Sequence, residues 1–209
     1  MKQAVIFMDG NNFYHNLKQM GIKPGNIDFQ KLSILICKNF NCSLREVRYY
    51  NSMPTIRDGQ EIYYSHLSFI DRLKTIKNFT VLTRKLQVHS NKELIKEKQE
   101  WINSLDLCDS CKPVVEQNFL DVIGSVKKKE KGVDVMLAVD LVEYAIKDKA
   151  DILIVFSGDA DFVPAMNLAK ENNKEVFSVS LSKGYSRELR EKFKFFVIGR
   201  NHLIEDCLK

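Results

Sequence analysis

Residues 151–162 constrain the fold of this chain more than any other stretch. Residues 152–156 form an unbroken apolar run of strand length, rich in branched side chains, which is typical of a strand covered on both faces in a parallel sheet. Ser-Gly-Asp-Ala-Asp follows directly at 157–161. Pro164 then opens a helical pattern, and proline is tolerated in a first helical turn. The stretch therefore predicts a buried strand, an acidic turn and a helix.

A second strand and turn of this kind opens the chain. Residues 4–8 are apolar, Asp9 follows them, and apolar residues then recur at helical spacing. Asp9 and Asp159 thus both follow a buried strand, where open α/β sheets bind ligands. Each acid also has a purely structural interpretation, because Asp9 and Asp161 could cap helices and Asp159 could close an Asx turn.

A third acidic position lies in a helix predicted to begin at about residue 132. Ala138, Leu141 and Ala145 follow Asp134 at offsets typical of one helical stripe. We therefore expect Asp134 on the core-facing stripe, where a carboxylate must satisfy donors or face a polar cavity. Asp140 projects from a different face, about 240° away, and is a poorer ligand candidate.

The rest of the chain continues the alternation of strands and helices. Further strands are predicted at 46–50, 79–88, 176–181 and 195–198, and helices at 13–20, 28–40, 62–76, 94–105, 164–172 and 187–193. Residues 114–126 suggest an extended hairpin or irregular connector. Strand, helix, strand units with short connections indicate right-handed crossovers in a parallel sheet. We expect an α/β fold with one domain over 1–209 and an elaborating segment at about 91–130.

Composition limits the alternatives. A chain of 209 residues suits one sizeable domain. No apolar stretch approaches the roughly 20 residues that span a bilayer, and the N-terminal segment does not resemble a signal peptide. We therefore expect a cytoplasmic protein without a membrane partner. The net charge of +5 permits a polyanionic partner without requiring one.

Five cysteines form an odd set, which argues against a disulfide framework in an intracellular protein. Cys108 and Cys111 make a lone C-x-x-C, which supplies only half of a four-ligand zinc site. A structural zinc there would need two further ligands from Cys37, Cys42, Cys207 or a histidine. Reduced thiols are the default expectation, and redox chemistry is the weakest.

The acids predict a metal site if the two strands are neighbours. One sheet edge would then carry Asp9, Asp159 and Asp161. The helix predicted to begin at about residue 132 would add Asp134. Such a cluster is stable only if it is partly protonated or neutralised by a cation. Oxygen ligands without histidine suit Mg²⁺ or Mn²⁺. The leading chemistry is phosphodiester hydrolysis.

Other side chains would support this chemistry. The supporting candidates beside the acids are Asn11, Asn12, Ser157 and Asp140. The basic candidates for holding RNA phosphates are Lys127, Lys128, Lys129, Lys131, Lys183, Arg187 and Arg190. The run at 127–131 could equally be a solvated loop.

Three motifs in combination resemble a known family. They are Phe-Met-Asp-Gly-Asn-Asn at 7–12, Lys-Gly-Val-Asp at 131–134 with Asp140 six residues on, and Ser-Gly-Asp-Ala-Asp-Phe at 157–162. They resemble the signatures of the NYN family, particularly its LabA-like branch, which is similar to PIN-domain nucleases. The resemblance implies a three-layer α/β/α sandwich with a mostly parallel central sheet. It also implies a Mg²⁺- or Mn²⁺-dependent ribonuclease site at Asp9, Asp134, Asp159 and Asp161.

Competing functions remain. A non-catalytic RNA-binding module could keep the same acids, and the sequence also leaves a homodimer open. A phosphatase of the haloacid dehalogenase type needs a second aspartate two positions after the first, where this chain has Asn11. A nucleotide-binding dehydrogenase is disfavoured because no G-x-G-x-x-G follows either strand.

Overall fold

The computed structural model describes residues 1–56, 59–85, 87–88, 92–124, 128–129 and 132–208. The chain divides into two compact units. Met1–Lys85 and Gly132–Lys209 form the first, called here the core unit, and Leu86–Lys131 forms the second, called the hairpin unit. Among the described residues, no helix combines the length and the apolar character needed to cross a bilayer.

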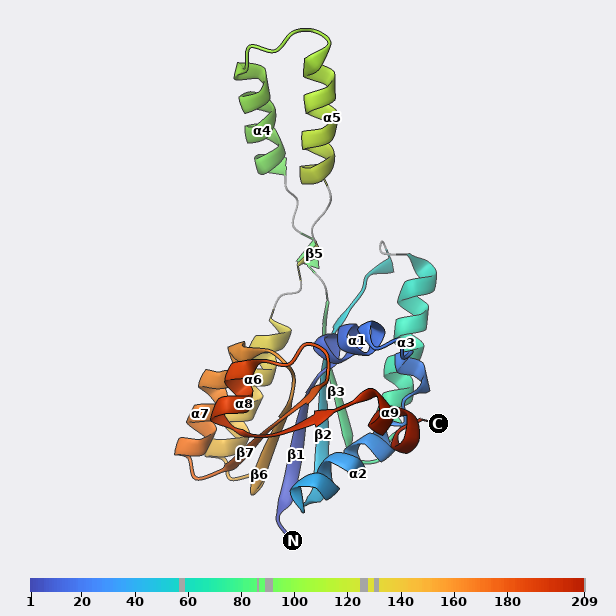
Figure 1. Cartoon of the computed structure of the whole chain (residues 1–209), viewed down its shortest axis with the longest axis vertical. Helices are drawn as coiled ribbons and strands as arrows, with labels where there is room; N and C mark the ends of the chain where they lie inside the picture. Colours follow the sequence, from blue (N-terminus) through green and yellow to red (C-terminus); the bar gives the residue numbers. More distant parts are fainter. Residues whose placement is uncertain (57–58, 86, 89–91, 125–127, 130–131, 209) are drawn as a thin grey trace. The chain divides into compact units, whose positions relative to one another are not determined.

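The core unit is built on one six-stranded sheet in the order β3-β2-β1-β6-β7-β8 (Figure 1). All neighbouring strands in it are parallel. The strands are β1 (Gln3–Asp9), β2 (Ser43–Met53), β3 (Phe79–Lys85), β6 (Ile152–Phe156), β7 (Glu175–Leu181) and β8 (Lys194–Ile198).

Helices cover both faces of the sheet, as Figure 1 shows. One face packs against α1 (Gly10–Gln19), α2 (Phe29–Phe40), α3 (Gln60–Lys74) and α9 (Arg200–Asp206). The other packs against α6 (Val133–Ile146), α7 (Val163–Glu171) and α8 (Arg187–Lys192). The predicted three-layer α/β/α sandwich is therefore confirmed, and its main sheet is wholly parallel.

The central strands explain this layering. In β1, Ala4, Ile6 and Met8 join the core beneath α1 and α2, whereas Val5 and Phe7 join the core beneath α6 and α7. All five side chains are fully buried. Because side chains alternate along a strand, a strand that is apolar at every position needs a helical layer on each side.

The predicted strand at 79–88 is wrong at its end. β3 stops at Lys85, and β4 (Gln87–Val88) pairs antiparallel with β5 (Lys128–Lys129) in a separate two-stranded ribbon. Part of the run at 127–131, for which a solvated loop and phosphate contact were both open, is therefore a short strand, so the loop interpretation is wrong for Lys128 and Lys129. Lys127 and Lys131 lie outside the described residues.

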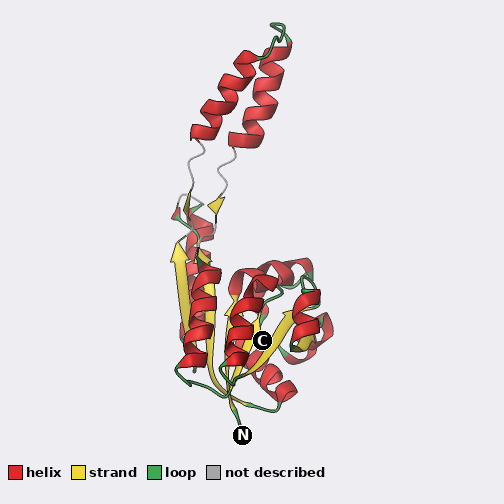
Figure 2. Cartoon of the chain, turned by 90° about the vertical axis from the view of Figure 1, so that its left-hand side faces the viewer, coloured by secondary structure: helices red, strands yellow, loops and turns green. Residues whose placement is uncertain are grey.

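The extended or irregular conformation expected at 114–126 is also wrong. Residues 114–124 lie in α5 (Cys111–Gly124), which packs side by side with α4 (Lys92–Ser104), as Figure 2 shows, and 125–126 lie outside the described residues. The adjacent residues Val114 and Val115 suggest a strand, because β-branched residues have a slightly lower helix propensity. Tertiary packing outweighs that preference. Ile102 of α4 is fully buried, and Gln99 Nε2 donates to Glu116 Oε1 at 2.9 Å.

Deleting buried volume from β6 should destabilise the core unit. Ile154→Ala should reduce the free energy of unfolding by about 2–5 kcal/mol, because it removes fully buried methyl groups and leaves a cavity. The matched control is Ile34→Ala at a site 46% exposed on α2, which should change it far less. Urea denaturation of both variants measures the difference, and equal losses would contradict the doubly covered sheet.

Candidate active site

The strand order reverses between β1 and β6. Chain segments after β1 extend the sheet on one side through β2 and β3, and segments after β6 extend it on the other through β7 and β8. The helices that follow these two strands, α1 and α7, cover opposite faces (Figure 1). Open α/β sheets bind ligands at such a switch point, beyond the carboxyl ends of the strands.

Asp9 ends β1 at this switch point and is only 5% exposed. Its Oδ1 accepts the backbone N–H of Asn12 at 3.0 Å, which caps α1. Its Oδ2 accepts the hydroxyl of Ser157 at 2.9 Å. Ser157 is fully buried and directly follows β6, so it anchors the carboxylate of Asp9 from the neighbouring strand.

Electrostatic repulsion links the predicted acids in pairs. Burial raises the pKa of Asp9, the bonds from Asn12 and Ser157 lower it, and the charges of Asp134 and Asp159 raise it again. Desolvation raises the pKa of Asp134, and the charges of Asp159 and Asp161 raise it further. The carboxyl groups of Asp9, Asp134 and Asp159 therefore lie within range of one another's charges, and Asp161 lies within range of Asp134.

Asp159 and Asp161 occupy the turn after β6. Oδ1 of Asp159 accepts the backbone N–H of Asp161 at 2.9 Å, so the predicted Asx turn is present and caps η3 (Ala160–Phe162). The N-cap of α7 is Phe162, so a capping role for Asp161 is wrong. Asp161 is exposed and Asp159 half-buried.

The turn is locked to α1 by an amide network. Asn12 Oδ1 accepts from Asn16 Nδ2 at 2.8 Å and from the Gly158 N–H at 3.1 Å. A Cβ on Gly158 would lie 1.6 Å from the carbonyl oxygen of Gly184, so the two backbones pass too closely for any side chain. Gly184 itself has a φ of 71°, which favours glycine. This packing fixes Asp159 relative to Asp9.

The predicted orientation of Asp134 is wrong. Asp134 is exposed, and the buried stripe of α6 runs through Val133, Leu137 and Leu141. The stripe is one residue out of phase with the prediction, which rotates Asp134 by about 100° away from the core. Asp134 nevertheless lies in the first turn of α6, where it reaches the acids of the β6 turn.

Asp140 lies apart from this group. Its Oδ2 accepts from Arg48 Nη2 at 2.7 Å and from the Tyr50 hydroxyl at 2.8 Å. Arg48 also donates to Tyr144 Oη and Glu46 Oε1. Six residues along a helix separate Asp140 from Asp134 by about 9 Å. The structure therefore places Asp140 in a half-buried ion-pair network between β2 and α6.

Two supporting asparagines differ in their contacts. Asn12 ties α1 to the turn after β6, as described above. Asn11 accepts a bond from the Ser52 hydroxyl at 3.1 Å, which links the first turn of α1 to β2. Both lie at the carboxyl edge of the sheet, beside Asp9.

Three of the predicted basic residues lie in the segment after β7 whose Gly184 packs against Gly158. Lys183, Arg187 and Arg190 are exposed and belong to the segment that includes Gly184. Arg187 pairs with Glu191 at 2.6 Å. The Arg190 guanidinium lies over the rings of Tyr185 and Phe195, at 4.8 and 4.7 Å from their centroids. Lys128 and Lys129 belong to the hairpin unit.

Arg84 was not among the predicted basic candidates, although a basic residue at the end of a strand was a usable signal. Arg84 lies at the carboxyl end of β3, on the same sheet edge as the acids. Its Nη1 lies 3.1 Å from where a Cβ on Gly132 would stand, directly before the first turn of α6. It is exposed and therefore accessible to an anion.

The acids suit a hard divalent cation. Among the described residues, no three His, Cys, Asp or Glu side chains converge into a ready-made ligand group. Mg²⁺ does not require one, because it keeps several waters and binds through one or two carboxylates together with substrate phosphates. A buried carboxylate repelled by neighbouring acids, with oxygen donors alone, fits this kind of ion.

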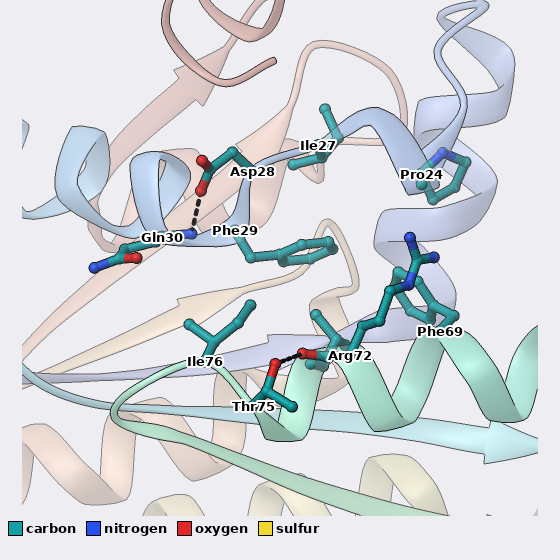
Figure 3. Close-up of a pocket in the computed structure, with 11 residues that line it drawn as sticks. Pro24, Ile27, Asp28, Phe29, Gln30, Phe69, Arg72, Thr75 and Ile76 are labelled. Atoms are coloured by element: carbon teal, nitrogen blue, oxygen red, sulfur yellow. Dashed lines mark hydrogen bonds between the residues drawn. The ribbon is translucent and has the colours of Figure 1, made fainter. Parts of the chain in front are cut away.

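A hollow of about 290 Å³ lies elsewhere, between the start of α2 and the end of α3 (Figure 3). Phe29, Phe69 and Ile76 line it, and Arg72 stands at its side. Ile76 leads into the amino end of β3, so this hollow lies away from the carboxyl edge that carries the acids.

Comparisons with known proteins agree with this architecture. A family model for the NYN domain matches residues 3–199. An uncharacterized protein of Methanocaldococcus jannaschii, MJ0482, is 38% identical over 58 residues, which cover 28% of this chain and 24% of that protein. This chain thus matches about a quarter of the length of that relative.

A solved structure has a similar fold. It is a protein of unknown function, VPA0982 from Vibrio parahaemolyticus, with a TM-score of 0.56 and 16% identity. The alignment covers 100% of this chain and 96% of that chain. At this identity the likeness concerns the fold alone.

A divalent cation should stabilise the core unit through the acids. Millimolar Mn²⁺ should raise the Tm at pH 7, with about 2.7 kcal/mol of added stability at 100 times Kd. Asp134→Asn should raise the Tm of the metal-free protein, because it removes a repelling charge, and should weaken the effect of Mn²⁺. Scanning fluorimetry with Mn²⁺ or EDTA measures both effects.

Asp140→Asn is the matched control for that experiment. It should lower the Tm, because it weakens the pair with Arg48, and leave the increment from Mn²⁺ unchanged. Two results would contradict the metal site. They are a Tm of the unchanged protein that does not change on addition of Mn²⁺, and a rise in the Tm of Asp134→Asn equal to that of the unchanged protein.

Gly158→Ala should displace the turn after β6. The added methyl group cannot fit against Gly184, so the backbone must shift, and we expect a loss of about 1–3 kcal/mol in stability. Mn²⁺ should also stabilise this variant less than the unchanged protein. Gly25→Ala, where no atom lies closer than 4.0 Å to the added group, is the control and should change neither measurement by more than about 1 kcal/mol.

Proposed function

Because this chain belongs to the NYN domain family, we propose that it is a divalent-metal-dependent ribonuclease that hydrolyses RNA phosphodiester bonds. NYN domains have a PIN-like nuclease fold, and NYN nucleases generally depend on divalent metals. The observation that carries the proposal is the buried carboxylate of Asp9 at the switch point, repelled by Asp134 and Asp159. An isolated structural acid would not gather further acids around it.

Asp9, Asp134, Asp159 and Asp161 are the residues that would hold the cation. Bound Mg²⁺ or Mn²⁺ supplies charge neutralisation and an activated water for hydrolysis at phosphorus. Two hydrogen bonds fix the carboxylate of Asp9 before any ligand arrives, and such preorganisation lowers the cost of reaching a reactive geometry. Ser157 and Asn12 are therefore positioning residues.

The neighbouring basic and aromatic side chains suit single-stranded RNA. Tyr185 and Phe195 are 47% and 41% exposed, and Arg190 lies over both rings. Exposed rings beside cations are typical of proteins that stack bases and track a phosphate backbone. Lys183 and Arg187 extend this surface.

The remaining basic candidates enter the proposal on different grounds. Arg84 would reach phosphates from the β3 side of the carboxyl edge. Four further lysines are proposed to contact RNA phosphates only because of their place in the sequence: Lys127, Lys128, Lys129 and Lys131.

Finer assignments belong to the same proposal. We assign the chain to the LabA-like branch on its three motifs, and we treat the hairpin unit as an elaboration of one NYN domain. Attack by an activated water leaves a 5′-phosphate and a 3′-hydroxyl. We place the activity in the cytoplasm.

Cleavage of labelled single-stranded RNA in Mn²⁺ tests the proposal. Asp9→Asn and Asp159→Asn should each lower the rate by more than about 100-fold, because they remove cation ligands. Ser157→Ala should lower it by about 10–100-fold, because it releases the carboxylate of Asp9. Asp140→Asn is the control and should keep the rate of the unchanged protein while it remains folded.

Product analysis separates the alternatives. Equal cleavage by all these proteins would identify a contaminant, and a 2′,3′-cyclic phosphate would contradict attack by water. RNA binding without turnover in Mg²⁺ or Mn²⁺ would mean that the chain is a non-catalytic RNA-binding module.

A further inference from the structure

The C-x-x-C motif plays no part in the proposed ribonuclease. Cys108 lies in the loop between α4 and α5, and Cys111 begins α5. Both are exposed and free. The motif thus stands at the turn of a helical hairpin, and both thiols are open to solvent.

The turn places the two cysteines close together in the chain. The carbonyl oxygen of Cys108 accepts the N–H groups of Cys111 and Lys112, both at 3.0 Å, so the chain closes a full turn between the two cysteines. Ser110 Oγ lies 3.2 Å from Cys108 Sγ on the same turn. Two exposed cysteines three residues apart on one turn have the spacing of a C-x-x-C pair of zinc ligands.

Two thiolates make half of a tetrahedral zinc site. The other three cysteines of the chain are buried in the core unit, where each is at most 6% exposed. Burial raises the pKa of Cys37 to about 12 and that of Cys207 to about 11, and it also raises the pKa of Cys42. This chain therefore offers no second pair of thiolates to complete the site.

We propose that the hairpins of two copies of this chain share one Zn²⁺, with Cys108 and Cys111 of each copy as its four ligands. The four cysteine sulfurs would bind Zn²⁺ as thiolates, at Zn–S distances of about 2.3 Å. Any of them that were thiols would release their protons on binding. Soft sulfur donors select zinc over Mg²⁺ or Mn²⁺. The inference does not depend on the proposed ribonuclease activity.

The hairpin is suited to such a contact. Trp101 and Val114 lie within a few residues of the turn and are 47% and 58% exposed, so a second hairpin could cover apolar surface there. The N-terminus of α5 also favours the negative charge of a four-thiolate zinc site.

The experiment uses the full chain, reduced, stripped with EDTA and titrated with Zn²⁺. Elemental analysis should give one zinc for every two chains. Light scattering should give a zinc-dependent particle of twice the 24.2 kDa of one chain. Co²⁺ in place of Zn²⁺ should give the absorption of a tetrahedral four-thiolate site.

Variants of the turn decide the ligands. Cys108→Ser and Cys111→Ser should each stay monomeric and bind Zn²⁺ about 100-fold or more weakly. Removing a metal ligand weakens binding more than removing a residue that only hydrogen-bonds to a ligand. Asp109→Asn, on the same turn, is the matched control and should keep both the zinc and the dimer. Cys42→Ala should also keep both, since its thiol is buried in the core unit.

Several results would overturn the inference. They are one zinc per monomer, retained zinc in the serine variants, loss of zinc in Asp109→Asn, and a reduced chain that binds no zinc. Because the thiols are exposed, the serine variants should unfold at the same Tm as the zinc-free chain, which shows that they are folded.

Discussion

The carboxylate of Asp9 is the constraint on which the site depends. It lies at the end of a strand buried on both faces, where an ionised group is costly unless its oxygens accept hydrogen bonds. The parallel register sets Met8 beside Phe156, so the next residues, Asp9 and Ser157, meet across the strands. Ser157 and Asn12 recover part of the cost, and Asp134 and Asp159 add repulsion. The fold thus holds together a charge arrangement that a divalent cation would relieve.

Asp140 and Asp134 lie on the same helix, α6, but their charges have different surroundings. Asp140 meets Arg48 and the Tyr50 hydroxyl, and its charge is neutralised within the sandwich. Asp134, about 9 Å away, interacts with other acids. The charge of a paired carboxylate is offset by its partner, whereas repulsion between carboxylates costs stability and makes Asp134 a candidate for binding a cation.

The two units offer different donor atoms. The core unit gathers carboxylate oxygens, which are hard ligands, and the hairpin unit presents two thiols, which are soft ones. Hard oxygen donors suit Mg²⁺ or Mn²⁺, and thiolates suit zinc. The proposed catalytic ion and the proposed bridging ion would therefore not compete for the same ligands.

The sequence by itself determined the doubly covered strands and the acids that follow them, because an apolar run and the turn after it are local patterns. Tertiary structure decided the rest. The phase of α6, and with it the orientation of Asp134, depends on which side chains pack against the sheet. The pairing of Asp140 with Arg48, 92 residues away, depends on the strand order. Val114 and Val115 favour a strand locally, but packing against α4 makes their segment a helix. Contacts between distant segments have no local signal, and only the folded chain supplies them.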